Sequence, residues 1–421
     1  MKPKKIIISL SILTITSILM GTISAAFLSL LQLVTGLREQ FHFLIIFLPL
    51  TGVATAFIYN KYGKNSNLGN NLIIESVQEE RNVPLRMSIL TFIFTIFTHL
   101  TGGSAGREGT AVQIGGALSN NLANYFKVEH KDKRIFVMAG ISAAFGSVFG
   151  TPLAGAFFGM EMCYIGKISY EALLPCFFSS YIADYITRLF GITHTSYVIK
   201  SIPSLSLYNI IILILASCAF GFMGRVFAIS VQALKKLYSN IIHNYLYRVV
   251  AGSLLYILVM VLLNAFKFTG LSTWIIQAGF DGKVTLLAPI KKLILTVLTL
   301  GCGFQGGEVT PLFDIGASVG GYIGQITHIE PSLLAALGLI SVFGCATNTP
   351  ITTIMLGIEM FGVNAIPYYI IAALISYYVS GNSGIYSSQI IMISKYQTQT
   401  DIGQRLGAIG NKSIFHRVFK A

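Results

Sequence analysis

The sequence predicts an all-α integral membrane protein that is polytopic and built from two related halves of broken and tilted helices. Two observations support this fold class. Of the 421 residues, 54% are hydrophobic and 11% are charged, whereas soluble domains carry about a quarter charged residues. A pair of glycine-rich and proline-containing motifs also occurs twice along the chain in the same order. A chain this apolar has too little polar surface to stay in water, so the expected surroundings are a lipid bilayer.

The apolar stretches have lengths that indicate both complete and broken helices. Residues 6–34 follow a basic start and are too long for a signal peptide, so we interpret them as a retained first helix with a cytoplasmic N-terminus. Further apolar stretches cover residues 43–59, 89–100, 210–234, 249–265 and 366–379. A complete span needs about 20 apolar residues. Because several stretches are shorter and many are interrupted, we expect re-entrant helices covered by protein or lining a cavity.

Charge and cysteine usage exclude several functions. The formal net charge is +13, but the basic residues lie in short loops, as the positive-inside rule requires. No basic block with interleaved aromatics indicates nucleic-acid binding. The five cysteines lie in or beside apolar stretches without metal-ligand spacing, so we expect no metal, disulfide or other cofactor. Catalytic motifs are missing as well, and we expect that the protein is not an enzyme.

Two motifs divide the chain into halves. Residues 151–162 and 349–360 both read T-P-[LI]-x5-G-[MI]-E-M. Upstream, Gly-Arg-Glu-Gly-Thr at 106–110 corresponds to Gly-Gly-Glu-Val-Thr at 306–310, and the glutamates precede the motif prolines by 44 and 42 residues. Such duplication is typical of transporters whose sites use discontinuous helices. We predict a single membrane domain over 1–421, with repeat halves at 1–200 and 201–395 and a short cytoplasmic tail at 396–421.

Each glycine-rich break precedes an expected helix start, where free N–H groups and the helix dipole favour an anion. Glycines such as Gly106 and Gly109 let the backbone approach that ion closely. The carboxylate of Glu108 would occupy the place that an anion prefers; ionised it competes with the anion, and protonated it can swing away. One residue could thus couple proton movement to anion movement. The alternative is a Glu108 that pairs with Arg107 at a loop surface.

The second break carries Glu308 in the corresponding place. The same argument applies, although a structural acid that caps a helix N-terminus is a stronger alternative here. Thr310 could offer its hydroxyl to an ion or cap the helix. Glu161 and Glu359 end the second motif of each half, and ion pairing or helix-end packing explains them better than chemistry.

Two polar segments outside the breaks are further candidates. Residues 67–71 include asparagines whose amides could donate hydrogen bonds to an anion, although an ordinary loop is the simpler explanation. Tyr386 follows a glycine and offers a phenolic donor, or it is a tyrosine of the membrane interface.

Together these motifs resemble the CLC family of anion channels and anion/proton exchangers, over most of the chain. Gly106-Arg-Glu-Gly109 is similar to that family's gating-glutamate motif, and Gly307-Glu-Val-Thr-Pro311 to its second anion-coordinating loop. Tyr386 matches the central tyrosine, and residues 69–73 align with the first anion-binding loop. The resemblance implies a CLC-like fold of two inverted repeats and a homodimer. It also implies a cell-membrane location, expected to be the bacterial plasma membrane.

Departures from the chloride members resemble the branch of fluoride/proton antiporters. Chloride/proton exchangers carry a second glutamate that feeds protons from the cytoplasm, and this chain has Met162 there. Glu308 and Thr310 stand where chloride members have apolar residues. Fluoride is small and strongly hydrated, so a selective site must supply strong donors such as a protonated carboxyl, a hydroxyl or an amide.

The resemblance therefore implies export of fluoride in exchange for protons, with Glu108 as the gate; a chloride channel or chloride/proton exchanger is the alternative. The expected anion-binding residues lie in the two breaks, the first loop and the tyrosine segment: Gly69, Asn70, Asn71, Gly106, Arg107, Gly109, Glu308, Val309, Thr310 and Tyr386. Which of the first three faces the ion stays open. Two other classes fit less well. An intramembrane hydrolase would need further catalytic residues that the sequence does not supply, and a structural scaffold would gain nothing from the glycine-rich breaks.

Overall fold

The computed structural model describes residues 3–396 and 401–410. The first part of the chain forms helices and one short strand: α1 (Pro3–Gln40), η1 (His42–Phe47), α2 (Leu48–Tyr62), η2 (Lys64–Leu68), α3 (Asn70–Gln78), α4 (Arg86–Leu100), α5 (Glu108–Tyr125), α6 (His130–Phe149), α7 (Pro152–Glu161), β1 (Tyr164–Ile165), η3 (Tyr170–Ala172) and α8 (Leu173–Leu189).

The second part follows a similar course after a long loop: α9 (Leu207–Ile241), α10 (Tyr245–Leu262), η4 (Phe266–Phe268), α11 (Trp274–Phe280), α12 (Leu287–Cys302), α13 (Val309–Thr327), α14 (Pro331–Thr347), α15 (Pro350–Phe361), η5 (Val363–Ala365), α16 (Ile366–Val379), β2 (Ile390–Ile391) and α17 (Leu406–Gly410). The strands β1 and β2 pair in parallel and join the end of α7 to the segment after α16.

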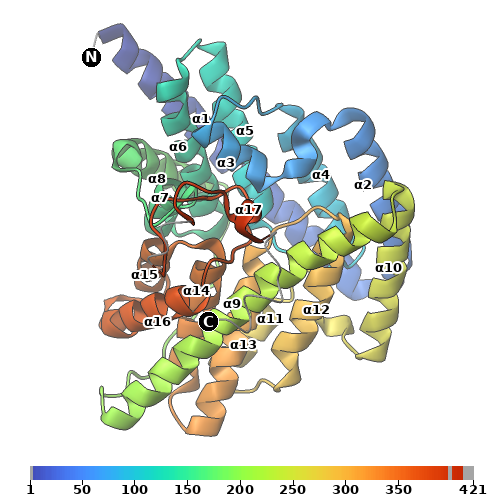
Figure 1. Cartoon of the computed structure of the whole chain (residues 1–421), viewed down its shortest axis with the longest axis vertical. Helices are drawn as coiled ribbons and strands as arrows, with labels where there is room; N and C mark the ends of the chain where they lie inside the picture. The colour runs from blue at the N-terminus through green and yellow to red at the C-terminus, as the bar shows by residue number, and fades with distance from the viewer. Residues whose placement is uncertain (1–2, 397–400, 411–421) are drawn as a thin grey trace.

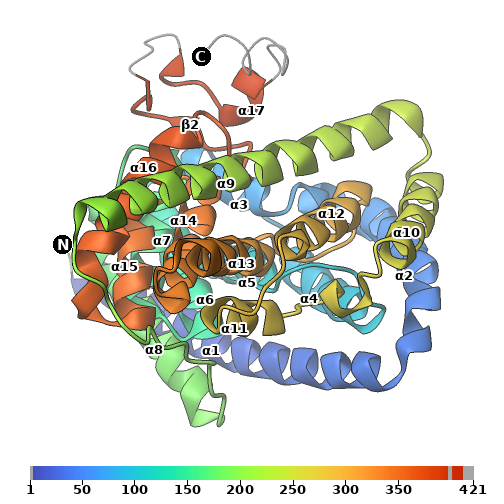
Figure 2. The ribbon, with the colours of Figure 1, turned by 90° about the horizontal axis from the view of Figure 1, so that it is seen from below.

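The helices form a bundle whose two longest members lie on opposite faces (Figure 1). Figure 2 shows α1 along one face and α9 along the other, with α5, α6 and α13 between them. Four helical segments among the described residues are long and apolar enough to cross a membrane: Lys5–Gln40, His42–Tyr62, Leu207–Ile241 and Tyr245–Leu262. The other helices are shorter or more polar, which agrees with the predicted broken helices.

The central helices approach one another through glycines at equivalent places in the two halves. A methyl group on Gly115 of α5 would overlap the carbonyl oxygen of Gly140 in α6. In the second half, a methyl group on Gly316 of α13 would overlap the carbonyl oxygen of Gly338 in α14. Because small residues allow close backbone contact inside a membrane, these pairs fix α5 against α6 and α13 against α14. The ends of α5 and α13 are thereby held in place at the centre of the molecule.

Glu161 and Glu359 connect the two halves through the motif helices α7 and α15. The Glu161 carboxylate accepts hydrogen bonds from Ile351 N at 3.1 Å and Thr352 N at 2.8 Å, at the start of α15. The Glu359 carboxylate accepts from the backbone N–H groups at the start of α7, at 2.8 and 2.9 Å. Each glutamate therefore caps a helix of the other half, which agrees with the predicted helix-end packing. Neither glutamate has an ion-pair partner among the described residues.

Most of the predicted tail at 396–421 lies outside the described residues. Of the tail, the structure describes residue 396 and residues 401–410. The segment that leads to it is anchored by Lys395, which lies beyond the membrane-spanning helices. Its Nζ donates to Ser380 Oγ at 2.9 Å and lies 3.9 Å from the centroid of the Tyr377 ring. Burial lowers the pKa of the Lys395 ammonium group to about 7.

Candidate anion-binding site

The two glycine-rich breaks meet at the centre of the molecule. Gly106 and Gly307 form an antiparallel bridge, with N–O distances of 2.6 and 2.8 Å between their backbones. The helices α5 and α13 begin at Glu108 and Val309, directly after this bridge. The first N–H groups of a helix have no partner inside it, so two sets of free donors converge on one place. The predicted helix starts at both breaks are thus confirmed.

Glycine is required where the breaks touch. A Cβ on Gly307 would lie 2.7 Å from Gly109 N and 3.1 Å from Glu108 N, closer than a methyl group allows. A Cβ on Gly106 would lie 2.8 Å from Glu108 Oε2. These two positions let the backbones approach closely enough for the N–H groups of both helices to face a common ligand.

The Glu108 carboxylate binds the start of α13. Its Oε2 accepts hydrogen bonds from Thr310 N at 3.0 Å and from Arg107 N at 3.1 Å, and its Oε1 accepts from the Thr310 hydroxyl. Arg107 Nε lies 3.4 Å from Oε1, yet only 1% of Glu108 is exposed, so this is no surface pair. The carboxylate occupies the place where the dipole of α13 favours an anion.

Glu308 is arranged differently from Glu108. It is the residue before α13, but its side chain makes no capping hydrogen bond, which disfavours the structural alternative. Its Oε2 would lie 3.4 Å from a Cβ on Gly109, and the Asn70 Nδ2 would lie 3.0 Å from the same point. The Glu308 carboxyl, the Asn70 amide and the Gly109 backbone are therefore neighbours across the break.

The structure distinguishes the three candidates of the first loop. Gly69 has a left-handed φ of +58° and directs the chain into α3. Asn70 is buried beside Gly109, and its Oδ1 has no partner among the described residues. Asn71 is engaged elsewhere, because its Oδ1 accepts from Ser388 N at 2.9 Å. Asn70 is thus the residue of this loop that faces the turn around Glu108, and Asn71 is hydrogen-bonded to the segment that carries Tyr386.

Tyr386 is an interior residue with 1% of its surface exposed, so it does not belong to a membrane-interface belt. Its hydroxyl has no hydrogen-bond partner among the described residues. The same is true of Gln113 Oε1, one turn beyond Glu108 on α5. Gln113 lies three residues after the 106–110 motif, and no role was predicted for it from the sequence because a glutamine on a helix gives no signal of its own.

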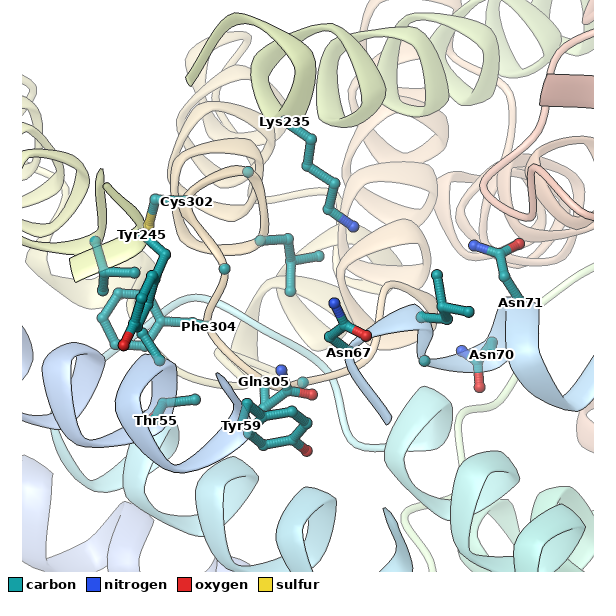
Figure 3. Close-up of a pocket in the computed structure, with 18 of the residues that line it drawn as sticks. Thr55, Tyr59, Asn67, Asn70, Asn71, Lys235, Tyr245, Cys302, Phe304 and Gln305 are labelled. Atoms are coloured by element: carbon teal, nitrogen blue, oxygen red, sulfur yellow. The ribbon is translucent and has the colours of Figure 1, made fainter. Parts of the chain in front are cut away.

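A cavity of about 510 Å³ leads to this site (Figure 3). Its lining includes Asn70, Tyr386, Gln113 and Glu308, but not Glu108. The cavity therefore reaches Glu308 but not Glu108, whose carboxylate is hydrogen-bonded to the start of α13. Three cationic side chains of η2, α9 and α10 are also part of the cavity lining, namely Lys64, Lys235 and Arg248. No group of three or more metal-ligating side chains occurs in the part of the chain that the structure describes.

The fold and the site define a class of protein: a helical membrane protein in which the N-terminal ends of two central helices, α5 and α13, meet at a buried polar site. The chain belongs to the voltage gated chloride channel family, whose model matches residues 51–381. This agrees with the CLC resemblance and with the predicted fold class.

Individual relatives agree with this assignment. A "Chloride/fluoride channel protein" of Pseudomonas syringae pv. tomato is 39% identical over 394 residues, which cover 92% of this chain and 87% of the relative. An "H(+)/Cl(-) exchange transporter ClcA" of Vibrio cholerae is 27% identical over 280 residues, covering 62% of this chain and 59% of the relative. A crystal structure of a CLC-type fluoride/proton antiporter superimposes with a TM-score of 0.89 at 35% identity, covering 92% of this chain and 99% of that one. A slow cyanobacterial Cl⁻/H⁺ antiporter shares the fold, with a TM-score of 0.77 at 18% identity.

Proposed function

We propose that this protein is a fluoride/proton antiporter that exports fluoride in exchange for protons, with Glu108 as its gate. The observation that carries the proposal is the binding of the Glu108 carboxylate to Thr310 N and the Thr310 hydroxyl. An ionised carboxylate competes with an anion for these donors, whereas a protonated one binds them weakly and leaves. Anion and proton then exchange in alternation at a single place.

The donors around the cavity floor suit fluoride. Asn70 presents an amide and Tyr386 a phenol at the cavity, a protonated Glu308 would add a carboxyl donor, and the Thr310 hydroxyl becomes free when Glu108 leaves. A strongly hydrated ion leaves water only where such groups replace its hydration shell. The name of the antiporter of known structure supports the same substrate, and the name of the Pseudomonas relative includes fluoride beside chloride.

The remaining assignments are part of the proposal. Halves at 1–200 and 201–395 would form one membrane domain of a homodimer in the bacterial plasma membrane, with 396–421 as a cytoplasmic tail. The cavity with Lys64, Lys235 and Arg248 would face the cytoplasm, because basic loops of membrane proteins concentrate there. Fluoride would enter through this cavity, and protons would reach Glu108 from the opposite side.

A chloride channel or chloride/proton exchanger is the second candidate, favoured by the Vibrio relative. Fluoride and chloride efflux from liposomes that contain the purified protein separates the two. Fluoride efflux that exceeds chloride efflux at least about tenfold supports the proposal. Equal rates for the two ions would refute it and favour the chloride function.

A further inference from the structure

Lys235 lies in the last two turns of α9, and its ammonium group points into the cavity (Figure 3). No ion pair or hydrogen bond joins this side chain to another residue in the described part of the chain. Arg248, by contrast, is held at the cavity wall, because its Nη2 and Nε donate to Ile242 O at 3.1 and 3.3 Å. Lys235 is therefore a cation without an ion-pair partner among the described residues, and Glu308 is the cavity carboxyl close enough to feel its charge.

The surroundings of Lys235 favour an anion. Glu308 is the single carboxylate among the residues that line the cavity, and it lies at the inner end. In Figure 3 the ammonium group points toward the wall that carries Asn67, and Asn70 and Asn71 follow further along this wall. A cleft lined mainly by one sign of charge raises the local concentration of the opposite ion. The Lys235 ammonium and the Asn67 amide thus lie in the cavity in front of the buried site around Asn70 and Glu308.

We propose that the Lys235 ammonium and the Asn67 amide form an entry site, at which fluoride is held before it reaches Asn70 and Glu308. The inference rests on the proposed function and adds a binding step to it. An ammonium offers three N–H donors and an amide two, so together they replace part of the hydration shell of the ion. Because the site is open to solvent, it binds weakly, and weak binding lets the ion move on.

The test compares Lys235→Met and Lys235→Arg with Lys236→Met. Lys236 is the adjacent residue of α9 and does not line the cavity, so its variant loses the same charge without touching the entry site. Initial fluoride flux in liposomes is measured against fluoride concentration. Lys235→Met should raise KM roughly three- to tenfold and leave the maximal rate and the fluoride-to-proton ratio unchanged. Lys235→Arg should stay near wild type.

Ionic strength gives a second readout. The KM of the wild type should rise with inert salt, because salt screens the attraction, and that of Lys235→Met should respond less. A Lys235→Met protein with the KM of Lys236→Met would overturn the entry site. So would an altered fluoride-to-proton ratio with an unchanged KM, because the lysine would then act on Glu308. If the wild type transports chloride but no fluoride, the proposed function fails, and the same series measured with chloride decides whether Lys235 receives the anion.

Discussion

Replacing Glu108 with glutamine removes the charge of the gate and keeps its size. The carboxylate accepts hydrogen bonds from Thr310 N, the Thr310 hydroxyl and Arg107 N. Glutamine keeps one acceptor oxygen and turns an N–H₂ group toward donors. Hydrogen bonds to charged groups contribute about 1.5–3 kcal/mol each. A loss of about 2–3 kcal/mol lowers the population of the state in which the side chain of residue 108 is bound at the start of α13 by roughly 30- to 160-fold.

The variant should therefore leave the start of α13 open to anions and carry no proton. The assay records fluoride with an electrode and protons with a pH-sensitive dye in the same liposomes. We expect proton movement driven by fluoride to fall to the level of empty liposomes. Glu171→Gln, a change at an exposed residue of η3 that pairs with Arg134 away from the site, is the control and should behave as the wild type. Undiminished proton coupling in Glu108→Gln would remove Glu108 from the mechanism.

Three further predictions address the framework. Gly307→Ala should abolish transport and lower the thermal stability, because its Cβ would lie 2.7 Å from Gly109 N; unchanged melting and flux would contradict the close approach. Glu161→Gln should destabilise the protein by about 1.5–3 kcal/mol, since the cap on α15 loses charged hydrogen bonds, and a melting curve like that of the wild type in detergent would contradict it. Burial lowers the Lys395 pKa from 10.5 to about 7, so the folded segment gains stability as pH rises from about 7 to 10.5. The rate of tryptic cleavage after Lys395, divided by the rate after the exposed Lys283, should therefore be lower at pH 9 than at pH 7. A higher ratio at pH 9 would contradict this.

The breaks were the most predictable part of the molecule. Glycines, an unusual intramembrane acid and a repeated spacing coincide there, and each has a direct physical consequence for a helix start. The repeated motif with Glu161 and Glu359 was also visible, but its role was not. Reciprocal capping depends on which helix of the other half lies opposite, and spacing along the chain does not contain that information.

Other features escaped prediction for different reasons. The helices α6 and α14 were not among the expected apolar stretches, because α6 begins with the charged segment 130–134 and α14 has only 17 residues; small residues pack both against α5 and α13. The choice between Asn70 and Asn71 depends on a contact with Ser388, more than 300 residues away. Lys235 resembles any surface lysine in the sequence, and only the cavity in front of it distinguishes it.

The central claim is that anion and proton exchange at one gate, and its most direct test is the direction of coupled flow. Liposomes with the wild-type protein receive an outward fluoride gradient at equal pH on both sides. The proposed exchange predicts that protons enter against the pH difference that builds up, and that an equal chloride gradient moves few or none. Fluoride efflux without proton entry would contradict it.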